Sequence, residues 1–164
     1  MAENKPLFPT IDTAPITSYY GWRINPISGL PEFHAAIDIS GGGVNLPIYA
    51  TQNAIISEKR NTSYGGYTVR LQHTRDPYYS QYQHMNAPSP LSVGAVVTKG
   101  DVIGYMGTTG SSTGIHLDFA IAITPDGWFT EEGTIDPLVY LEMDFPPIPT
   151  VKKKMPLYMY LRKF

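Results

Sequence analysis

The sequence predicts one mainly β domain with few or no helices. Fifteen Gly, fifteen Pro and twelve Tyr occur among 164 residues, and this composition favours strands and turns over helices. No segment repeats its apolar residues at the period of a helix. The length suits a single domain with a real core, because a chain of this size buries most of its apolar surface on folding.

Short apolar and aromatic segments bounded by turn residues are the predicted strands. They occupy residues 47–59, 66–74, 78–85, 101–107 and 114–123. The Ser-Tyr-Gly-Gly sequence at 63–66 predicts a hairpin turn between the first two, and the Pro-containing segment at 86–91 is a predicted loop.

The two ends of the chain differ from the part between them. Residues 17–141 are predicted to form the domain, and residues 1–16 are expected to be an arm or linker. The basic and aromatic tail, 142–164, ends in a segment that mixes five cations with apolar residues. Two interpretations of this tail stay open: a packed terminal strand with a solvated Lys cluster, or a docking segment for a partner or an anionic surface.

Composition excludes several classes of function. A formal net charge of −2 offers no broad cationic surface to nucleic acid. The absence of Cys excludes thiolate metal sites and leaves His, Asp and Glu as ligands. No stretch reaches the roughly 18 apolar residues of a membrane span, and the first residues lack the pattern of a secretory signal. We therefore expect no nucleic-acid or membrane partner. If the protein acts outside the cell, we expect it to be released by cell lysis or as part of an assembled particle.

One predicted strand, Gly-Ile-His-Leu-Asp-Phe-Ala-Ile at 114–121, carries two polar residues of chemical interest. An extended chain directs His116 and Asp118 to one face and the apolar residues between and after them to the other. The pair could be two metal ligands, one ligand and one proton-transfer group, or a buried hydrogen-bonded pair. Spacing alone does not choose among these.

The other three His residues are weak signals when each is taken alone. His34 and Asp38 are four apart, but the Ile residues that flank Asp38 indicate a strand, so the pair meets only through a bend before that strand. Alternation in its strand favours a structural role for His73, with its hydrogen bonds satisfied. His84 shares a predicted face with Tyr82 and by itself is uninformative.

Taken together, these residues resemble the lysostaphin/LytM-type zinc endopeptidases of bacterial cell walls. The shared pattern consists of three pieces in order: His34-x3-Asp38, a Tyr-x-His84-Met strand, and Gly-Ile-His116-Leu-Asp118-Phe. The resemblance runs from about residue 17 to residue 137. Its most specific part is Gly-Thr-Thr-Gly-Ser-Ser-Thr-Gly before the last strand.

The resemblance implies a fold and a set of roles. The fold is a twisted antiparallel β-sandwich, the LytM-like duplicated hybrid motif, with a groove that holds an extended peptide. His34, Asp38 and the residue at 118 correspond to the zinc ligands, and three protein ligands leave an open position for water. His84 and His116 correspond to the catalytic residues, since imidazoles titrate in the range needed to move the proton of that water.

Asp118 stands where the family has a His. Asp binds zinc, but its side chain is shorter than imidazole, so the metal or the strand must shift to meet it. A second carboxylate also makes the centre formally neutral, which weakens its polarising power and tilts its preference towards harder ions such as Mn²⁺. We therefore expect His34, Asp38 and Asp118 to bind one Zn²⁺ ion, with Mn²⁺ as the alternative. We expect the enzyme to be slow, or to be active with only some metal ions.

The leading hypothesis is a metal-dependent endopeptidase that hydrolyses peptide bonds of bacterial peptidoglycan. We expect it to act outside the cell at the wall, as a phage lysin or tail component with other tail proteins as partners. The alternative is a catalytically lapsed structural domain of a tail tip or knob. Retention of the other four functional positions favours the enzyme. Phosphotransferase and lipoyl or biotin carrier domains share some turns, but the His-x-Asp strand after a Ser/Thr/Gly loop disfavours them.

Overall fold

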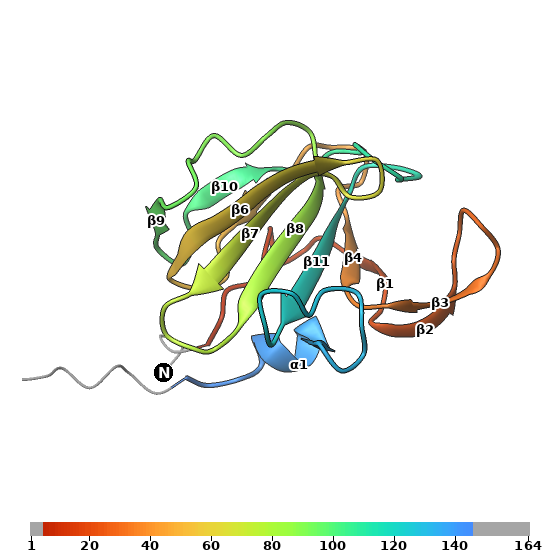
Figure 1. Ribbon diagram of the computed structural model, residues 1–164. Coiled ribbons are helices and arrows are strands. Elements are labelled where there is room, and N and C mark those ends of the chain that lie inside the picture. Colours follow the sequence, from red (N-terminus) through yellow and green to blue (C-terminus); the bar gives the residue numbers. More distant parts are fainter. Residues whose placement is uncertain (1–4, 146–164) are drawn as a thin grey trace, which may run out of the picture.

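The computed structural model describes residues 5–145, which form one large and two small antiparallel sheets (Figure 1). The large sheet has eight strands. Seven of them lie side by side in the order β1 (Ile16–Ser18), β4 (Ile37–Ser40), β11 (His116–Ala122), β8 (Tyr79–Met85), β7 (Gly66–His73), β6 (Ala54–Thr62) and β9 (Val96–Val97). The eighth, β12 (Thr134–Ile135), pairs with β11. The small sheets pair β5 (Pro47–Tyr49) with β10 (Val102–Tyr105) and β2 (Gly21–Ile24) with β3 (Pro31–His34). Within residues 5–145 the one helix is α1 (Pro137–Leu141), so the expectation of a mainly β fold is confirmed.

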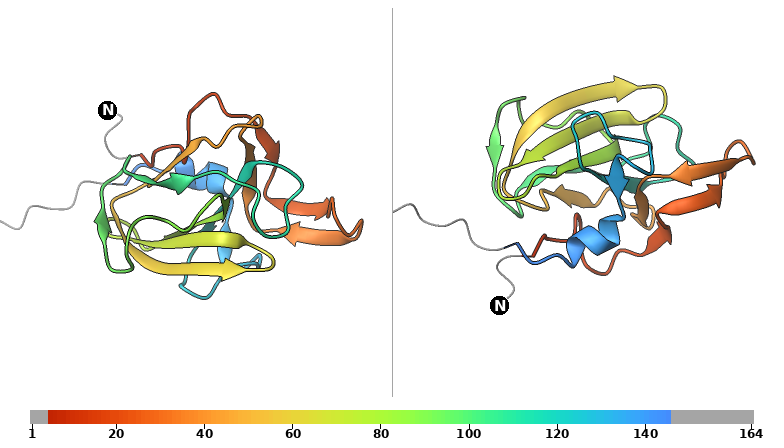
Figure 2. Two further views of the ribbon diagram at one scale, coloured as in Figure 1. Left: turned by 90° about the horizontal axis from the view of Figure 1, so that it is seen from above. Right: turned by 60° about the horizontal axis from the view of Figure 1, so that its bottom comes forward.

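The core lies between one face of the large sheet and the β5–β10 pair (Figure 2). Alternate residues of β8 and β11 face it, and Tyr82, Leu117 and Phe119 are fully buried there. Ile48 of β5 and Ile103 of β10 pack against them from the other layer. Each such side chain contributes about 1.5–3 kcal/mol through burial. The opposite face of the same strands is therefore free to carry polar residues.

Four of the five predicted strands occur close to their predicted bounds, and the hairpin turn at 63–66 joins β6 to β7. The fifth, 47–59, is wrong as a single strand because it divides into β5 and β6. The chain pairs with β10 in the small sheet and then with β7 in the large one. Residues 50–53 therefore have to cross from one layer to the other.

The ends of the domain are only partly described. The backbone N–H of Leu7 donates to the carbonyl of Thr51, and that of Tyr49 to the carbonyl of Pro9, so residues 7–9 run beside β5. The division of the chain at residues 16 and 141 stays a prediction, and most of the basic tail, 146–164, lies outside the described residues. No helix among residues 5–145 is long and apolar enough to span a membrane.

The β2–β3 hairpin projects beyond the large sheet, at the right of Figure 1. β3 ends at His34, residues 35–36 bend, and β4 begins at Ile37. The predicted bend between His34 and Asp38 is thus confirmed. It brings the end of the hairpin over the outer face of the sheet, where the polar residues lie.

Candidate metal centre and active site

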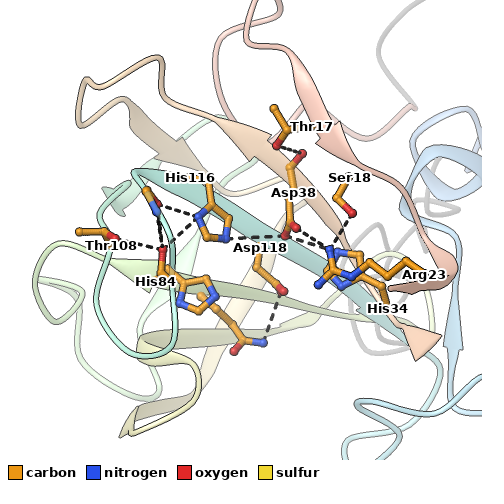
Figure 3. Close-up of polar contacts among 12 residues, drawn as sticks. Thr17, Ser18, Arg23, His34, Asp38, His84, Thr108, His116 and Asp118 are labelled. Carbon is orange, nitrogen blue, oxygen red and sulfur yellow. Dashed lines mark hydrogen bonds and ion pairs between the residues drawn. The ribbon is translucent and has the colours of Figure 1, made fainter. Parts of the chain in front are cut away.

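Three potential ligands from three strands meet on the outer face of the sheet (Figure 3). Asp38 of β4 lies directly opposite Asp118 of β11 in the antiparallel register. His34 reaches them from the end of β3. Each residue offers one ligand atom, and these atoms all lie within 4.8 Å of one another. Small side-chain rotations would bring all three to a single ion.

Two of these atoms have no other partner. The Nε2 atom of His34 and the Oδ1 atom of Asp38 are buried and make no hydrogen bond, although they lie 3.4 Å apart. Buried polar atoms are rarely left unpaired, because each has lost its hydrogen bonds to water. A nitrogen and two carboxylates are also a donor set that zinc accepts. The three residues therefore fit a divalent metal ion.

Arg23 of β2 holds the other oxygen of Asp38. Its Nη1 atom donates to Asp38 Oδ2 at 2.9 Å and to the hydroxyl of Ser18 at 2.6 Å, while its Nε atom donates to Glu32 Oε1 at 2.9 Å. Burial by itself would raise the pKa of Asp38, but the contacts with His34 and Arg23 outweigh it and lower that pKa. Asp38 is therefore an anion whose Oδ1 atom is left for a ligand.

Asp118 has the opposite electrostatic setting. Burial and the charge of Asp38 raise its pKa to about 6, against the opposing influence of His34 and His116. The Nε2 atom of Gln83, its neighbour on β8, donates to Asp118 Oδ1 at 3.3 Å. Without a cation beside it, this carboxyl keeps its proton up to a higher pH than an ordinary Asp does. Two buried carboxylates facing each other would be relieved by a divalent ion.

His84 reaches the site through an unusual backbone conformation. Its φ is +59°, a left-handed value that is uncommon for a residue with a side chain. Tyr82 remains fully buried in the core, whereas His84 lines the cleft over the metal ligands. The prediction that the two share a face is therefore wrong, because the backbone at His84 breaks the alternation of the strand.

A loop contact fixes the orientation of the His84 ring. Its Nδ1 atom lies 2.8 Å from the carbonyl of Thr109, so this nitrogen carries the proton and Nε2 keeps its lone pair. The Thr109 hydroxyl donates to the carbonyl of Met85 at 2.6 Å and accepts from the backbone N–H of Tyr67 at 3.0 Å. Burial lowers the pKa of His84, so its ring is neutral at pH 7.

His116 is held in a similar way on the opposite side of the cleft. Its Nδ1 atom lies 2.8 Å from the carbonyl of Gly114 and 3.2 Å from the hydroxyl of Ser112. A carbonyl can only accept, so here too Nδ1 carries the proton. Nε2 lies 3.7 Å from Asp38 Oδ1, and the ring centroid lies 4.7 Å from that of His84. The two imidazole rings therefore stand side by side next to the three candidate ligands.

Asp38, Asp118 and both imidazoles line one cleft of about 390 Å³, whereas buried His34 lines a narrow cavity of about 30 Å³ beside Asp118. The hairpin loop at 25–28 lines one side of the cleft and the Ser/Thr/Gly loop at 111–115 lines another. The side chain of Tyr64, from the turn between β6 and β7, also lines it. The structure thus brings all five predicted site residues together, four in the lining of the cleft and His34 within ligand distance of Asp38 and Asp118, and their chemical roles stay predictions.

His73 lies away from this site. Its ring is buried between Asp76, which contacts Nδ1 at 2.8 Å, and Ser80, which contacts Nε2 at 2.9 Å. The hydroxyl of Tyr140 approaches Nδ1 at 3.0 Å. The prediction of a structural His with its hydrogen bonds satisfied is confirmed.

Three residues of the site were missed in the sequence. The strand alternation that buries Tyr82 also places Gln83 on the outer face, and this signal could have found it. Arg23 and Thr109 gave no such signal, because their contacts join segments 15 and 24 or more residues apart.

Comparisons with known proteins give a consistent picture. Residues 32–136 match Peptidase family M23. The chain is 32% identical over 108 residues to the DD-carboxypeptidase/endopeptidase Mpg of Neisseria meningitidis, covering 66% of this chain and 24% of that protein. It is 28% identical over 101 residues to the peptidoglycan DD-endopeptidase ShyA of Vibrio cholerae, covering 62% and 23%. The chain thus spans about a quarter of the length of these relatives.

Solved structures share the same fold. The catalytic domain of lysostaphin from Staphylococcus simulans superposes with a TM-score of 0.69 at 26% identity, covering 80% of this chain and 95% of that one. A zinc-containing peptidase from Vibrio cholerae superposes with a TM-score of 0.67 at 24% identity, covering 88% and 41%.

Proposed function

Because the chain belongs to peptidase family M23, we propose that it is a metal-dependent endopeptidase that hydrolyses peptide bonds of bacterial peptidoglycan. Its homology to the LytM/lysostaphin-type endopeptidases confirms the resemblance drawn from the sequence. The curated relatives carry names that describe hydrolysis of this kind. The substrate of this chain is part of the proposal.

One observation carries the proposal: three candidate ligands lie within reach of one ion, and two oriented imidazoles line the cleft beside them. His34, Asp38 and Asp118 would hold the ion, which is zinc by preference for such a donor set. When bound, zinc would polarise a water molecule and the scissile carbonyl. Arg23 supports this arrangement by fixing one oxygen of Asp38.

The two imidazoles are suited to move protons in this reaction. Each has its Nδ1 proton held by a backbone carbonyl, so each Nε2 can accept a proton. The neutral ring of His84 would take the proton of the attacking water as the carbon–oxygen bond forms. The protonated ring would then give that proton to the amine that leaves when the peptide bond breaks. His116, beside Asp38, would orient the water or the carbonyl.

Metal content tests the proposed ligands. The full chain, purified without added metal, should contain one equivalent of zinc by mass spectrometry of the elements. Asp118→Ala should lose the ion, since only His34 and Asp38 would remain, while circular dichroism shows that the fold persists. The matched control is Asp126→Ala, which removes an exposed carboxylate outside the cleft. Equal zinc content in the two variants would rule out Asp118 as a ligand.

A structural role is the second candidate, and the same carboxylate favours it. Without an ion the pKa of Asp118 is raised to about 6, so below that pH its carboxyl is protonated and is a poor ligand. A domain that had lost its metal could keep this fold and the hairpin around the cleft. Absence of zinc even after incubation with excess ion would support this candidate over the enzyme.

The setting of the reaction is a separate proposal. We propose that the protein acts on the wall from outside, as a phage lysin or tail component, as its sequence led us to expect. Detection of the chain in purified virions by mass spectrometry would support the tail assignment. Detection only in the lysate would support a lysin.

A further inference from the structure

A polar row continues from the metal ligands across the outer face of the large sheet. Asp118 of β11 pairs with Gln83 of β8, and two residues along the strand Gln81 pairs with Arg70 of β7. Arg60 of β6 lies beyond them at the edge of the same surface. Figure 1 shows these four strands side by side. The row changes from carboxylates at one end to guanidinium groups at the other.

A second cavity of about 430 Å³ covers the cationic end of this row. Its lining includes Arg60, Arg70 and Gln81, with the rings of Tyr64 and Phe129, which meet edge to face at 6.3 Å. No carboxylate lines it. A narrow cavity of about 30 Å³ shares Gln81 and Tyr64 with this cavity, and Asp118 and Tyr64 with the cleft that holds the candidate ligands.

Gln81, which lines this cavity, has an unused donor. The side-chain oxygen of Gln81 accepts from Arg70 Nε at 2.6 Å, which identifies the other amide atom as nitrogen. That Nε2 atom is buried and has no hydrogen-bond partner, and the residue is only 1% exposed. A buried donor without a partner is costly. It would be satisfied by an acceptor that enters the cavity.

The charge around the cavity selects the kind of acceptor. Arg70 and Arg60 share one carboxylate, that of Glu58, at 2.7 Å and 3.3 Å. Arg70 also lies over the ring of Trp128, 4.5 Å from its centroid. One positive charge is therefore left over among these three residues. Exposed Asp126 also acts on Arg70, but it does not line the cavity.

We propose that this cavity is a substrate subsite that binds a carboxylate of the peptidoglycan peptide through Gln81, Arg60 and Arg70. β7 lies two strand spacings from β11, or about 10 Å, and an extended peptide advances about 3.3 Å per residue. The carboxylate recognised here is therefore about three residues from the bond that is cut. A free C-terminus and an acidic side chain both supply this group.

The inference rests on the proposed function, and calorimetric titration with synthetic stem peptides tests it. The probe is L-Ala-D-γ-Glu-L-Lys-D-Ala-D-Ala, titrated into the full chain with and without EDTA. Three further peptides carry an amide at the C-terminus, at the Glu carboxyl, or at both. The free peptide should bind at least tenfold more tightly than the doubly amidated one. The single amide that loses affinity identifies which carboxylate is bound.

Two variants assign the effect to this cavity. Arg60→Gln removes a half-exposed cation and should reduce affinity for the free peptide about tenfold without changing that for the doubly amidated one. Gln81→Glu keeps the acceptor for Arg70, replaces the unused donor with an acceptor, and should abolish the preference for the carboxylate. Lys5→Gln, which removes a cation paired with Glu142 far along the chain, is the matched control and should change nothing.

Failure of this inference differs from failure of the proposed function. Equal binding of free and amidated peptides, or equal effects of Arg60→Gln and Lys5→Gln, would overturn the subsite even if walls are hydrolysed. Selective binding of the carboxylate without hydrolysis of walls would overturn the enzyme and leave the subsite.

Discussion

At the scale of single residues, Asp118 would set the charge of the proposed metal centre. It faces Asp38 across two strands. Burial and the charge of Asp38 raise the pKa of Asp118, whereas at Asp38 the contacts with His34 and Arg23 outweigh burial and lower the pKa. A cation bound between the two carboxylates would therefore compensate the negative charge of Asp118.

The raised pKa of Asp118 predicts a pH dependence of stability in the metal-free protein. Its carboxyl has a pKa of 3.8 when unfolded and about 6 when folded, so folding favours the protonated form. The contribution is fully present below pH 3.8 and is lost as the pH rises through about 6. The size is about 3 kcal/mol, at 1.36 kcal/mol per pKa unit.

Urea unfolding in EDTA between pH 4 and pH 7 measures this contribution. The free energy of unfolding of the parent should fall over this range relative to that of Asp118→Asn, which cannot ionise. Parallel pH profiles for the two proteins would contradict the electrostatic description of Asp118.

His84 and His116 predict a separation of metal binding from catalysis. Neither is needed to complete the ligand set, so His84→Ala and His116→Ala should retain zinc. Each should slow the hydrolysis of purified walls by about 10²–10⁴-fold, the usual contribution of a positioned acid or base. Parental rates in both variants would refute their catalytic roles.

At the scale of elements, the loop before β11 holds His84 in place. Gly110 packs so closely on the turn before β7 that an added Cβ would lie 2.3 Å from the backbone nitrogen of Gly66. Thr109 in the same loop bonds β7, β8 and the His84 ring. The strained backbone at His84 thus depends on a loop that lies 25 residues further along the chain.

Thr109→Val should therefore weaken both the fold and the reaction. Valine has nearly the same shape but leaves the carbonyl of Met85 and the N–H of Tyr67 without their partner. We expect a loss of roughly 1–3 kcal/mol in the free energy of unfolding, with slower wall hydrolysis and unchanged zinc content. The control is Thr74→Val, because that exposed hydroxyl donates to the carbonyl of Asn53, away from the cleft. Equal effects of the two substitutions would contradict this role of the loop.

The same elements show what could be predicted from the sequence. Alternation in β11 correctly separates Leu117 and Phe119 in the core from His116 and Asp118 in the cleft, because strand geometry is local. Alternation fails at His84, whose left-handed backbone is stabilised by a distant loop. The contact between Arg23 and Asp38 depends on how the β2–β3 hairpin lies over the sheet, which no local pattern specifies.

At the scale of the whole molecule, one sheet serves two purposes. One face packs against the β5–β10 pair and forms the core, and the other carries the metal ligands and a polar row towards β6. Loops and the β2–β3 hairpin rise around the second face and form the cleft. In the proposed enzyme, this division would allow the sheet to position the reacting groups while the loops contact the peptide.

The most direct measurement is mass spectrometry of peptides released from purified peptidoglycan. The account predicts that the zinc-loaded chain produces new peptide termini at one kind of bond, and that EDTA or Asp118→Ala prevents their appearance. Walls that keep every peptide bond intact, in the presence of a chain carrying one equivalent of zinc, would contradict the assignment of an endopeptidase.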